Sequence, residues 1–151
     1  MHFREATIND IKELQVIRHL VKENTLSDPS LVTDADCARF LTTDGKGWVC
    51  ESNGAIAGFA IIDTTGNNIW ALFMRPEFEK KGMGKRLHDI MLDWYFNQSR
   101  NALWLGTAPN TRAEIFYRRK GWIETGRRKN GEIKFEMSYD DWMQIRKDIP
   151  G

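Results

Sequence analysis

The sequence predicts an α/β fold in which a mixed β-sheet carries helices on its faces. The main observation is the order of local patterns, because strand-like and helix-like segments follow one another as β-α-α-β-β-β-α-β-α-β-β. A second observation is the size and composition of the chain, which has 151 residues, 41% of them hydrophobic and 28% charged. These values suit a soluble protein with one core, so we expect a single domain over residues 1–151.

The N-terminal part of the chain predicts one strand and two helices. Residues 2–6 predict a short strand, and Asn9 or Asp10 can cap the helix that follows. The apolar residues of this helix recur at helical spacing and are Ile11, Leu14, Ile17 and Val21. A polar loop over residues 22–33 separates it from the second helix.

The second helix leads into a meander of three strands. Thr33 or Asp34 can cap this helix, which ends near Leu41. The segments "GWVCES" and "AIAGFAIID" predict two strands, and Asn53-Gly54 between them suits a type I′ hairpin turn. The third strand, "IWALFM", is apolar almost throughout, which predicts burial on both faces and a central position.

The second half of the chain continues the alternation. A helix after the turn at residues 80–84 has an apolar face made of Met83, Leu87, Ile90, Met91 and Trp94. The segment "ALWLGT" predicts a buried strand, and a helix follows over about residues 110–120. The segments "WIETG" and "EIKFEM" predict a hairpin around Asn130-Gly131, and "DDWMQIRKD" predicts a terminal helical turn.

Charge and cysteine content exclude several classes of protein. The sequence holds 22 Lys and Arg against 21 Asp and Glu, so no overall field draws it to nucleic acid or to an anionic membrane. Cys37 and Cys50 are too few and too far apart for a zinc site or a disulfide framework. The N-terminus has no apolar leader pattern, and no apolar run is long enough to cross a bilayer. We therefore expect a cytoplasmic protein without a metal.

A local cluster of cations surrounds two glycines at the start of a predicted helix. Lys80 and Lys81 precede Gly82-Met83-Gly84, and Lys85 and Arg86 follow. Free N–H groups at a helix N-terminus bind phosphate, and glycines let an anion approach the backbone closely. The arrangement suits a pyrophosphate, although a solvated helix start with incidental lysines is an equally good reading of the turn alone. Neither the dinucleotide-binding fingerprint nor the Walker loop fits its spacing.

Two motifs together give this turn a more specific meaning. The first is Pro76 followed by residues 79–84, which fits the pattern [Arg/Gln]-x-x-Gly-x-[Gly/Ala] except at its first position. The second fits Asn-x-x-Ala-x-x-x-Tyr-x-x-x-Gly-[Phe/Trp] and consists of Asn110, Ala113, Tyr117, Gly121 and Trp122. With both motifs at the usual separation, the chain resembles the GCN5-related N-acetyltransferase (GNAT) family over nearly its whole length. The pair is far more specific than either motif alone.

The resemblance implies a fold and a cofactor. The fold would be a mixed, mostly antiparallel sheet of about seven strands flanked by helices and splayed between its fourth and fifth strands. The cofactor would be acetyl-CoA, with pantetheine in the splayed gap along the strand backbone and the pyrophosphate on the N–H groups of the glycine turn. The residues expected to bind it are Phe73, Met74, Glu79, Lys80, Lys81, Gly82, Met83, Gly84, Lys85, Asn110, Ala113, Phe116 and Tyr117.

One residue of the first motif departs from the family pattern. Glu79 stands where Arg or Gln is usual, and a carboxylate beside phosphates is unfavourable. The family uses mainly the backbone at this position, so binding should survive if Lys80 or another cation offsets the charge.

The resemblance also implies the chemistry. By position, the backbone N–H of Met74 would stabilise the developing oxyanion, and Tyr117 would protonate the departing thiolate of CoA. Tyr117 could instead be a packing residue beside Phe116 and Ala113. Asn110 would bind the pantetheine arm, act as helix N-cap, or do both.

The general base and the acceptor site are less well marked in the sequence. Many relatives carry a Glu on the central strand, but "GNNIWALFM" has no carboxylate, so water or a distant acid must deprotonate the amine. The loop over residues 22–33 usually shapes the acceptor site in this family. The weak candidates for substrate contacts are Glu23, Asn24, Ser27, Asp28 and Trp70. Trp48, Trp70 and Trp104 could wall an apolar slot, although strand tryptophans are more often core residues.

Three functions remain open at this stage. The resemblance implies an acetyl-CoA-dependent N-acetyltransferase for a primary amine of a small molecule or peptide, acting as a monomer or homodimer through direct attack in a ternary complex. A non-catalytic acetyl-CoA-binding module is the first alternative, because the strand carboxylate is missing. A nucleic-acid-binding domain is the second, because residues 118–120 and 127–129 are all basic. A solvated face that partly serves the 3′-phosphate of CoA explains these clusters better, and the acceptor stays unidentified.

Overall fold

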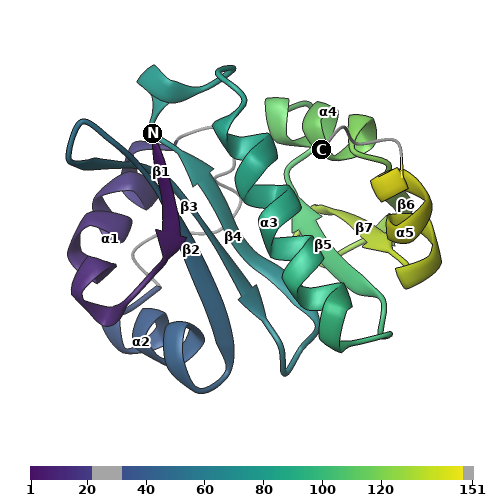
Figure 1. Ribbon diagram of the computed structural model, residues 1–151. Coiled ribbons are helices and arrows are strands. Elements are labelled where there is room, and N and C mark those ends of the chain that lie inside the picture. Colours follow the sequence, from purple (N-terminus) through teal and green to yellow (C-terminus); the bar gives the residue numbers. More distant parts are fainter. Residues whose placement is uncertain (22–31, 148–151) are drawn as a thin grey trace.

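A seven-stranded sheet with helices on both faces forms the core of the protein (Figure 1). The computed structural model describes residues 1–21 and 32–147. The strands are β1 (His2–Glu5), β2 (Gly45–Ser52), β3 (Ala55–Asp63), β4 (Asn68–Met74), β5 (Leu103–Thr107), β6 (Ile123–Arg127) and β7 (Ile133–Met137). The α-helices are α1 (Ile11–Leu20), α2 (Asp34–Thr42), α3 (Met83–Gln98), α4 (Arg112–Arg119) and α5 (Tyr139–Lys147), and short 3-10 turns are η1 (Ile8–Asp10) and η3 (Pro76–Phe78). The predicted α/β class and the predicted order of strands and helices along the chain are confirmed.

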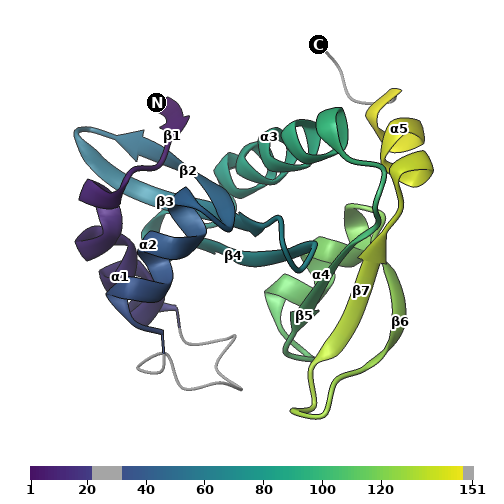
Figure 2. The same cartoon turned by 90° about the horizontal axis from the view of Figure 1, so that it is seen from below.

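The sheet has the spatial order β1-β2-β3-β4-β5-β7-β6, and all neighbours except β4 and β5 are antiparallel. The parallel pair β4–β5 meets only at Asn68 and Trp104, where the Trp104 N–H donates to the carbonyl of Asn67 at 3.0 Å. Beyond this point the two strands separate, and Figure 2 shows β4 turning away from β5. The expected splay between the fourth and fifth strands is therefore present.

A β-bulge in β4 accompanies the separation. Ile62 pairs with Ile69 and Ile61 pairs with Ala71, so Trp70 is an extra residue without a partner on β3. A bulge increases the local twist of its strand and bends it. We infer that this bend carries the second half of β4 away from β5.

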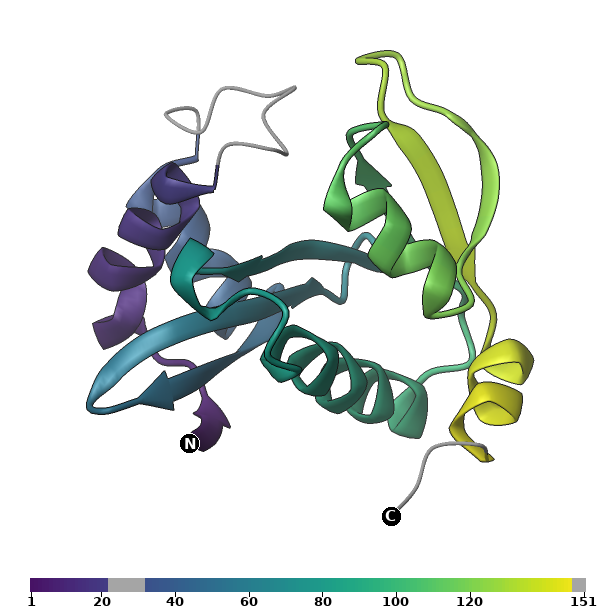
Figure 3. The same ribbon diagram turned by 90° about the horizontal axis from the view of Figure 1, so that it is seen from above.

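Two groups of apolar side chains cover opposite faces of the sheet. One face packs against α3, α4 and α5, with Leu87, Leu105 and Phe135 fully buried. The other face packs against α1 and α2, with Leu14 and Phe59 at its centre. Figure 3 shows α1 and α2 beside the β1–β4 half, and α4 and α5 beside the other half. Among the described residues, no helix is long and apolar enough to span a membrane.

The helix ends follow the predicted caps only in part. The Thr33 side chain accepts from the N–H of Asp36 and caps α2, as expected. At α1, Asp10 occupies the N-cap position as expected but its side chain makes no capping bond to that helix, because η1 precedes the helix and Thr7 is the cap of that turn. Asp10 completes this capping box through the Thr7 N–H, and Val21 lies just beyond the end of α1.

Other predicted elements differ in extent. Asn53 and Gly54 have φ values of 53° and 81°, so the β2–β3 hairpin has the positive φ pair that a type I′ turn needs. The helix predicted from residue 110 begins at Arg112, and α5 is longer than the single turn expected. Residues 72–74 of β4 are only partly buried, because the strand has left its neighbour on that side.

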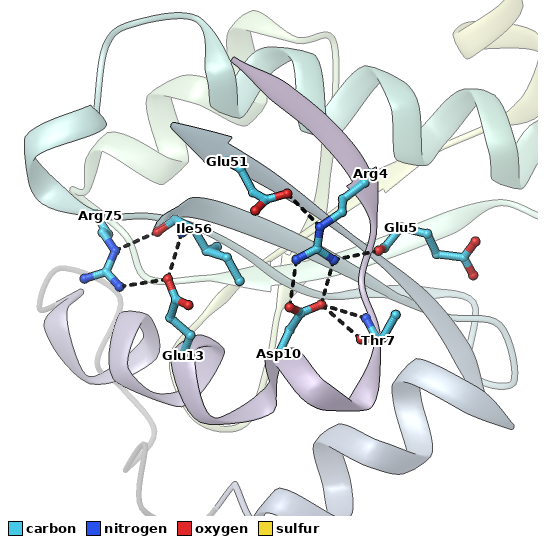
Figure 4. Close-up of polar contacts among 8 residues, drawn as sticks. All are labelled: Arg4, Glu5, Thr7, Asp10, Glu13, Glu51, Ile56 and Arg75. Atoms are coloured by element: carbon cyan, nitrogen blue, oxygen red, sulfur yellow. Dashed lines mark hydrogen bonds and ion pairs between the residues drawn. The ribbon is translucent and has the colours of Figure 1, made fainter. Parts of the chain in front are cut away.

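A partly buried polar network fixes the N-terminal strand and helix against the sheet (Figure 4). The Arg4 guanidinium donates two hydrogen bonds to Asp10, at 2.8 and 2.9 Å, and one to Glu51 of β2 at 2.7 Å. Asp10 is only 8% exposed, and the pKa of its carboxyl is lowered, chiefly by Arg4. One arginine thus joins β1, η1 and β2.

We expect Asp10→Ala to lower the free energy of unfolding by about 1–3 kcal/mol, because it leaves the partly buried Arg4 without its bidentate partner. Chemical denaturation measures this change. The matched control is Glu5→Ala, which removes an ion pair to Lys46 from a side chain that is 58% exposed and should change stability by less than about 1 kcal/mol. Equal losses in the two variants would contradict the role assigned to Asp10.

A second polar contact in Figure 4 fixes the end of β4. The Arg75 side chain donates to the carbonyl of Ile56 at 2.7 Å and pairs with Glu13 at 3.5 Å. Glu13 also accepts from the N–H of Ile56 at 2.7 Å. Arg75 follows Met74 directly, so α1 and β3 together hold the last residue of β4 in place.

Candidate functional site

The free edge of β4 presents backbone groups to the gap between β4 and β5. The N–H of Arg75 donates to the carbonyl of Ala57 on β3 at 2.8 Å. Because backbone groups of successive strand residues point to opposite sides, those of Met74 and Leu72 face away from β3. The Met74 N–H is therefore directed into the gap, which is what an oxyanion donor requires.

The same alternation changes one expectation about the cofactor contacts. Phe73 pairs with Phe59 in register, and its N–H and carbonyl point toward β3. The register thus does not favour the expected backbone contact from Phe73, and Leu72 is the residue that presents its backbone to the gap beside Met74. The alternation along the strand separates Leu72 from Phe73 only when the pairing register of β4 on β3 is known, and that register could not be predicted from the sequence.

The glycine turn exposes a row of N–H groups. Lys80 and Gly82 have φ values of 65° and 85°, in the left-handed region, and Gly82 is the N-cap of α3. The first helical bond runs from the Arg86 N–H to the Gly82 carbonyl, at 3.1 Å. Among the described residues, the N–H groups of residues 80–85 have no backbone acceptor. The turn can therefore bind an anion through several donors at once.

Packing joins this turn to the end of β4. A Cβ on Gly84 would lie 3.5 Å from Cγ of Met74, so the Met74 side chain runs directly beneath the turn. On its other side, Met74 covers Gly58 so closely that a Cβ there would lie 2.1 Å from the sulfur. The two glycines hold the strand end and the helix start at a short, fixed separation.

Four cations surround the turn, as the sequence predicts. Lys80, Lys81, Lys85 and Arg86 are exposed, and none of them forms an ion pair with another residue in the described part of the chain. Two of them lie over aromatic rings: the Lys81 ammonium is 5.6 Å from the Phe78 ring, and the Arg86 guanidinium is 5.9 Å from the Phe3 ring. Their charge is available to a ligand.

The unusual carboxylate of the first motif has a partner. Arg112, in the first turn of α4, forms an ion pair with Glu79. The cation that offsets Glu79 is therefore Arg112 rather than Lys80. This contact also joins the two motifs, since Glu79 belongs to the first and Arg112 lies within the second.

Tyr117 occupies a buried position on α4, 6% exposed. Its ring lies 5.2 Å from that of Phe116 and 5.8 Å from that of Trp122. Burial raises the pKa of its phenol above the ordinary value of 10.0, so it keeps its proton at neutral pH. Its hydroxyl makes no hydrogen bond with the residues the structure describes. Tyr117 therefore packs in the core and also carries a proton that it could donate.

Other residues of the second motif lie at the N-terminal end of α4. Asn110 is exposed, has a positive φ of 62°, and its N–H donates to the Glu114 side chain at 2.8 Å. Its proposed role as N-cap is wrong, because the Thr111 side chain accepts from the Glu114 N–H. Ala113 and Phe116 are partly buried against the core beneath α3.

A buried polar atom at the end of β5 has no partner among the described residues. Thr107 is 1% exposed, and its Oγ1 has no hydrogen-bond partner among the described residues. It is the last residue of β5, three positions beyond the point where β4 and β5 meet. Pantetheine carries amide groups of the kind that could satisfy such an atom.

His88 is a residue that the sequence analysis missed. It is fully buried on α3, and its Nε2 accepts from the Trp122 indole N–H at 3.0 Å. Its Nδ1 therefore carries the proton and donates to Asp89 at 2.8 Å, and Asp89 also pairs with Lys120 at 2.8 Å. This network explains the tryptophan of the second motif, which ties α4 to α3 behind Tyr117. A histidine on an otherwise apolar helix face was the available signal.

Burial lowers the pKa of His88 below its ordinary value of 6.5, against the opposing effect of Asp89. The unfolded chain therefore takes up a proton below about pH 6.5 that the folded protein does not, so stability should fall as pH decreases. The variant His88→Gln keeps an acceptor for Trp122 but no longer takes up this proton when it unfolds. We expect the free energy of unfolding of the variant to depend on pH less steeply, by up to about 1.4 kcal/mol per pH unit. Urea denaturation from pH 7 to pH 5 measures both proteins, and identical slopes would contradict the assignment.

The candidate acceptor residues are only partly placed. Glu23, Asn24, Ser27 and Asp28 lie outside the described residues. The three tryptophans do not line one slot: Trp48 is 7% exposed in the core beneath α3, whereas Trp70 packs on the opposite face of the sheet. Trp104 is partly exposed and borders a surface cavity of about 450 Å³.

Most of the second basic region is neutralised by neighbours. Arg118 pairs with Glu114 at 2.8 Å and with Glu124, and Arg128 pairs with Glu132 at 2.7 Å. These pairs weaken the case for a nucleic-acid surface. Another cavity, of about 720 Å³, lies between the C-terminal end of α3 and α5, at the opposite end of α3 from the glycine turn.

Comparison with known proteins agrees with this geometry. A sequence model described as the acetyltransferase (GNAT) family matches residues 10–122, which include both motifs and the gap. No match is found among curated protein sequences.

The structure is similar to several solved acetyltransferases. The PaiA N-acetyltransferase from Thermoplasma acidophilum, in complex with coenzyme A, gives a TM-score of 0.78 at 16% identity over 91% of this chain and 98% of that one. A phosphinothricin acetyltransferase from Sinorhizobium meliloti, in complex with AcCoA, gives a TM-score of 0.74 at 18% identity over 91% of this chain and 87% of that one. The ribosomal-protein-S18-alanine N-acetyltransferase from Escherichia coli gives 0.67 at 18% identity over 90% of each chain. At these identities the likeness shows a common fold.

Proposed function

The chain belongs to the acetyltransferase (GNAT) family, and from this premise we propose that it transfers an acetyl group from acetyl-CoA to a primary amine of a small molecule or peptide. Transfer occurs by direct attack of the amine in a ternary complex. The observation that carries the proposal is the pairing of two features at one place: the inward N–H of Met74 and the row of N–H groups at residues 80–85.

The residues of the turn and the gap divide the binding of acetyl-CoA between them. The N–H groups of residues 80–85 hold the pyrophosphate, and the nearby lysines and Arg86 add attraction that salt screens. The backbone of Leu72 and Met74 pairs with the pantetheine amides, with Thr107 on the opposite strand. The Asn110 side chain, exposed at the start of α4, is a further donor to this arm. Two solved relatives contain coenzyme A or AcCoA, which supports this ligand.

Acetyl-CoA supplies an activated acetyl thioester. The Met74 N–H stabilises negative charge on the carbonyl oxygen, as a preorganised donor does in other acyl transfers. The Tyr117 phenol donates its proton to the departing sulfur, and its raised pKa keeps that proton in place until then. Because β4 contains no carboxylate, water accepts the proton of the attacking amine.

An amine panel tests this function. The protein is mixed with acetyl-CoA and with polyamines, amino acids, aminoglycosides or peptides with free N-termini, and release of the CoA thiol is followed. We expect amine-dependent thiol release with at least one class, and a product heavier by one acetyl group in mass spectrometry. If acetyl-CoA binds but no amine raises thiol release, the chain is the non-catalytic binding module instead.

A further inference from the structure

Arg18 of α1 is a partly buried cation without a counter-ion among residues 1–21 and 32–147. Its Nη2 is shielded from solvent and has no hydrogen-bond partner, and Arg18 forms no ion pair within residues 1–21 and 32–147. Buried charges in proteins are normally paired, because removing them from water is costly. Burial accordingly lowers the pKa of this guanidinium, and a nearby thiol, Cys37, gives only slight compensation. The described part of the chain therefore leaves this charge unpaired.

Aromatic rings hold this guanidinium against β4. Its central carbon lies 4.8 Å from the Trp70 ring and 5.1 Å from the Phe73 ring. The Phe40 ring, 4.4 Å from that of Trp70, supports the platform from α2. Cation–π contacts orient the guanidinium through its flat faces and use none of its N–H donors.

The position of Arg18 is next to the reacting groups. Trp70 and Phe73 span the stretch of β4 that borders the gap, about 10 Å of extended chain. Met74, whose N–H enters the gap, is the next residue. The Arg18 guanidinium lies on the face of the sheet opposite α3, with α1 and α2. An acceptor that approaches the gap from this face would meet it.

Two lysines without an ion pair in the described part of the chain, Lys129 and Lys134, lie on the same face across the gap, beside Arg128, which pairs with Glu132. Leu103 and Leu105 point into the core beneath α3, so Trp104 between them points to the opposite face. The Arg128 guanidinium and the Lys134 ammonium lie 5.0 and 5.5 Å from its ring. They line the cavity of about 450 Å³ together with Trp104, Arg127, Lys129 and Asn130, and no acidic residue lines it. The unpaired lysines among them give this face a local positive charge that would attract an anion.

We propose that the acceptor is a small acidic amine, with a carboxylate or phosphoryl group near its amino group, and that Arg18 binds that anionic group. This rests on the proposed function and names the class of amine that it uses. The planar guanidinium can donate two parallel hydrogen bonds to either group, which fixes the orientation of the ligand. Because the guanidinium lies over the ring of Phe73, the residue before Met74, the anionic group and the amine would belong to one small molecule.

Matched pairs of acceptors test the proposal in the wild-type protein. Glycine, β-alanine and 4-aminobutyrate are compared with their amides, and 2-aminoethyl phosphate with ethanolamine, by thiol release. We expect kcat/KM to be at least about tenfold higher for the acidic member of the best pair, because hydrogen bonds between charged groups give about this discrimination. The amides have less basic amines, more of which are neutral at a given pH, so this difference in basicity works against the expected result.

Arg18→Met then assigns the preference to this residue. Methionine keeps an apolar side chain over Trp70, so we expect kcat/KM for the acidic amine to fall by about 10–100-fold, mainly through KM, with that for its amide changed by less than about threefold. Acetyl-CoA affinity should not change. The matched control is Arg39→Met, which removes an arginine that also lies over a ring, Phe40, but is 54% exposed and paired with Asp44.

The outcomes separate this proposal from the proposed function. A wild-type preference for amides or polyamines overturns the role of Arg18 and leaves the acetyltransferase standing. Equal losses for acidic and neutral amines in Arg18→Met also overturn it. If no amine supports thiol release, the proposed function itself fails. If Arg18→Met does not fold, the wild-type comparison of acids and amides still decides whether the acceptor is acidic.

Discussion

Gly82→Asp should weaken acetyl-CoA binding by about a hundredfold or more, equivalent to about 2.7 kcal/mol. Gly82 is the N-cap of α3, and a Cβ there meets no atom within 4 Å, so the variant adds a charge without an internal clash. That charge stands among the N–H groups of residues 80–85. Two like charges 4 Å apart repel by about 1–4 kcal/mol, depending on the local dielectric constant, and pyrophosphate carries more than one.

The control for this variant is Gly54→Asp. Gly54 has nearly the same conformation, with φ of 81° against 85°, and also faces open space, but lies in the β2–β3 hairpin. Both variants should lose about 1–2 kcal/mol of stability from the left-handed backbone, and only Gly82→Asp should lose affinity in calorimetry. Unchanged affinity in a folded Gly82→Asp variant would remove the glycine turn from the cofactor site.

Tyr117→Phe should lower turnover by about ten- to a thousandfold while stability and acetyl-CoA affinity change little. The variant keeps the ring and its contacts with Phe116 and Trp122 but removes the proton available to the sulfur. Because burial raises the pKa of the phenol above 10.0, the alkaline loss of activity that depends on it lies above pH 10. In Tyr117→Phe, the alkaline fall in rate that comes from loss of the phenolic proton should be absent from the pH–rate profile.

Steady-state rates with a good acceptor, together with a single-turnover rate, measure the effect. Tyr139→Phe is the control, since Tyr139 begins α5 and packs on Phe96, away from the gap. A wild-type rate in Tyr117→Phe, with chemistry limiting, would make the phenol a packing residue and water the acid. The fold and the cofactor site would stand in that case.

The order of elements could be predicted because each segment carries its own signal. Asn53-Gly54 marks the β2–β3 hairpin, and the alternation in "EIKFEM" gives the half-buried pattern of β7. Helix starts were less predictable. Thr7, Asp10 and Thr111 lie next to residues that could cap equally well, and tertiary contacts such as that of Arg4 with Asp10 decide among them.

The site could be predicted wherever backbone conformation defines it. Gly82 and the helix that follows fix the N–H groups of the turn, and these follow from a local motif. Leu72 could not be distinguished from Phe73 without the register of β4 on β3, which the bulge at Trp70 shifts. Arg18 and His88 could not be assigned from the sequence. The unpartnered Nη2 of Arg18 and the hydrogen bond of His88 with Trp122, which follows α4, are properties of the folded protein.

Hydrogen–deuterium exchange with and without acetyl-CoA tests most directly that the cofactor enters the gap between β4 and β5. The N–H groups of residues 80–85 have no backbone acceptor, so they exchange fast in the free protein and any protection is easy to detect. The account predicts protection in peptides that cover Leu72 to Met74 and residues 80–85. Protection confined to the cavity between α3 and α5, or to the β6–β7 hairpin, with none at the glycine turn, would contradict it.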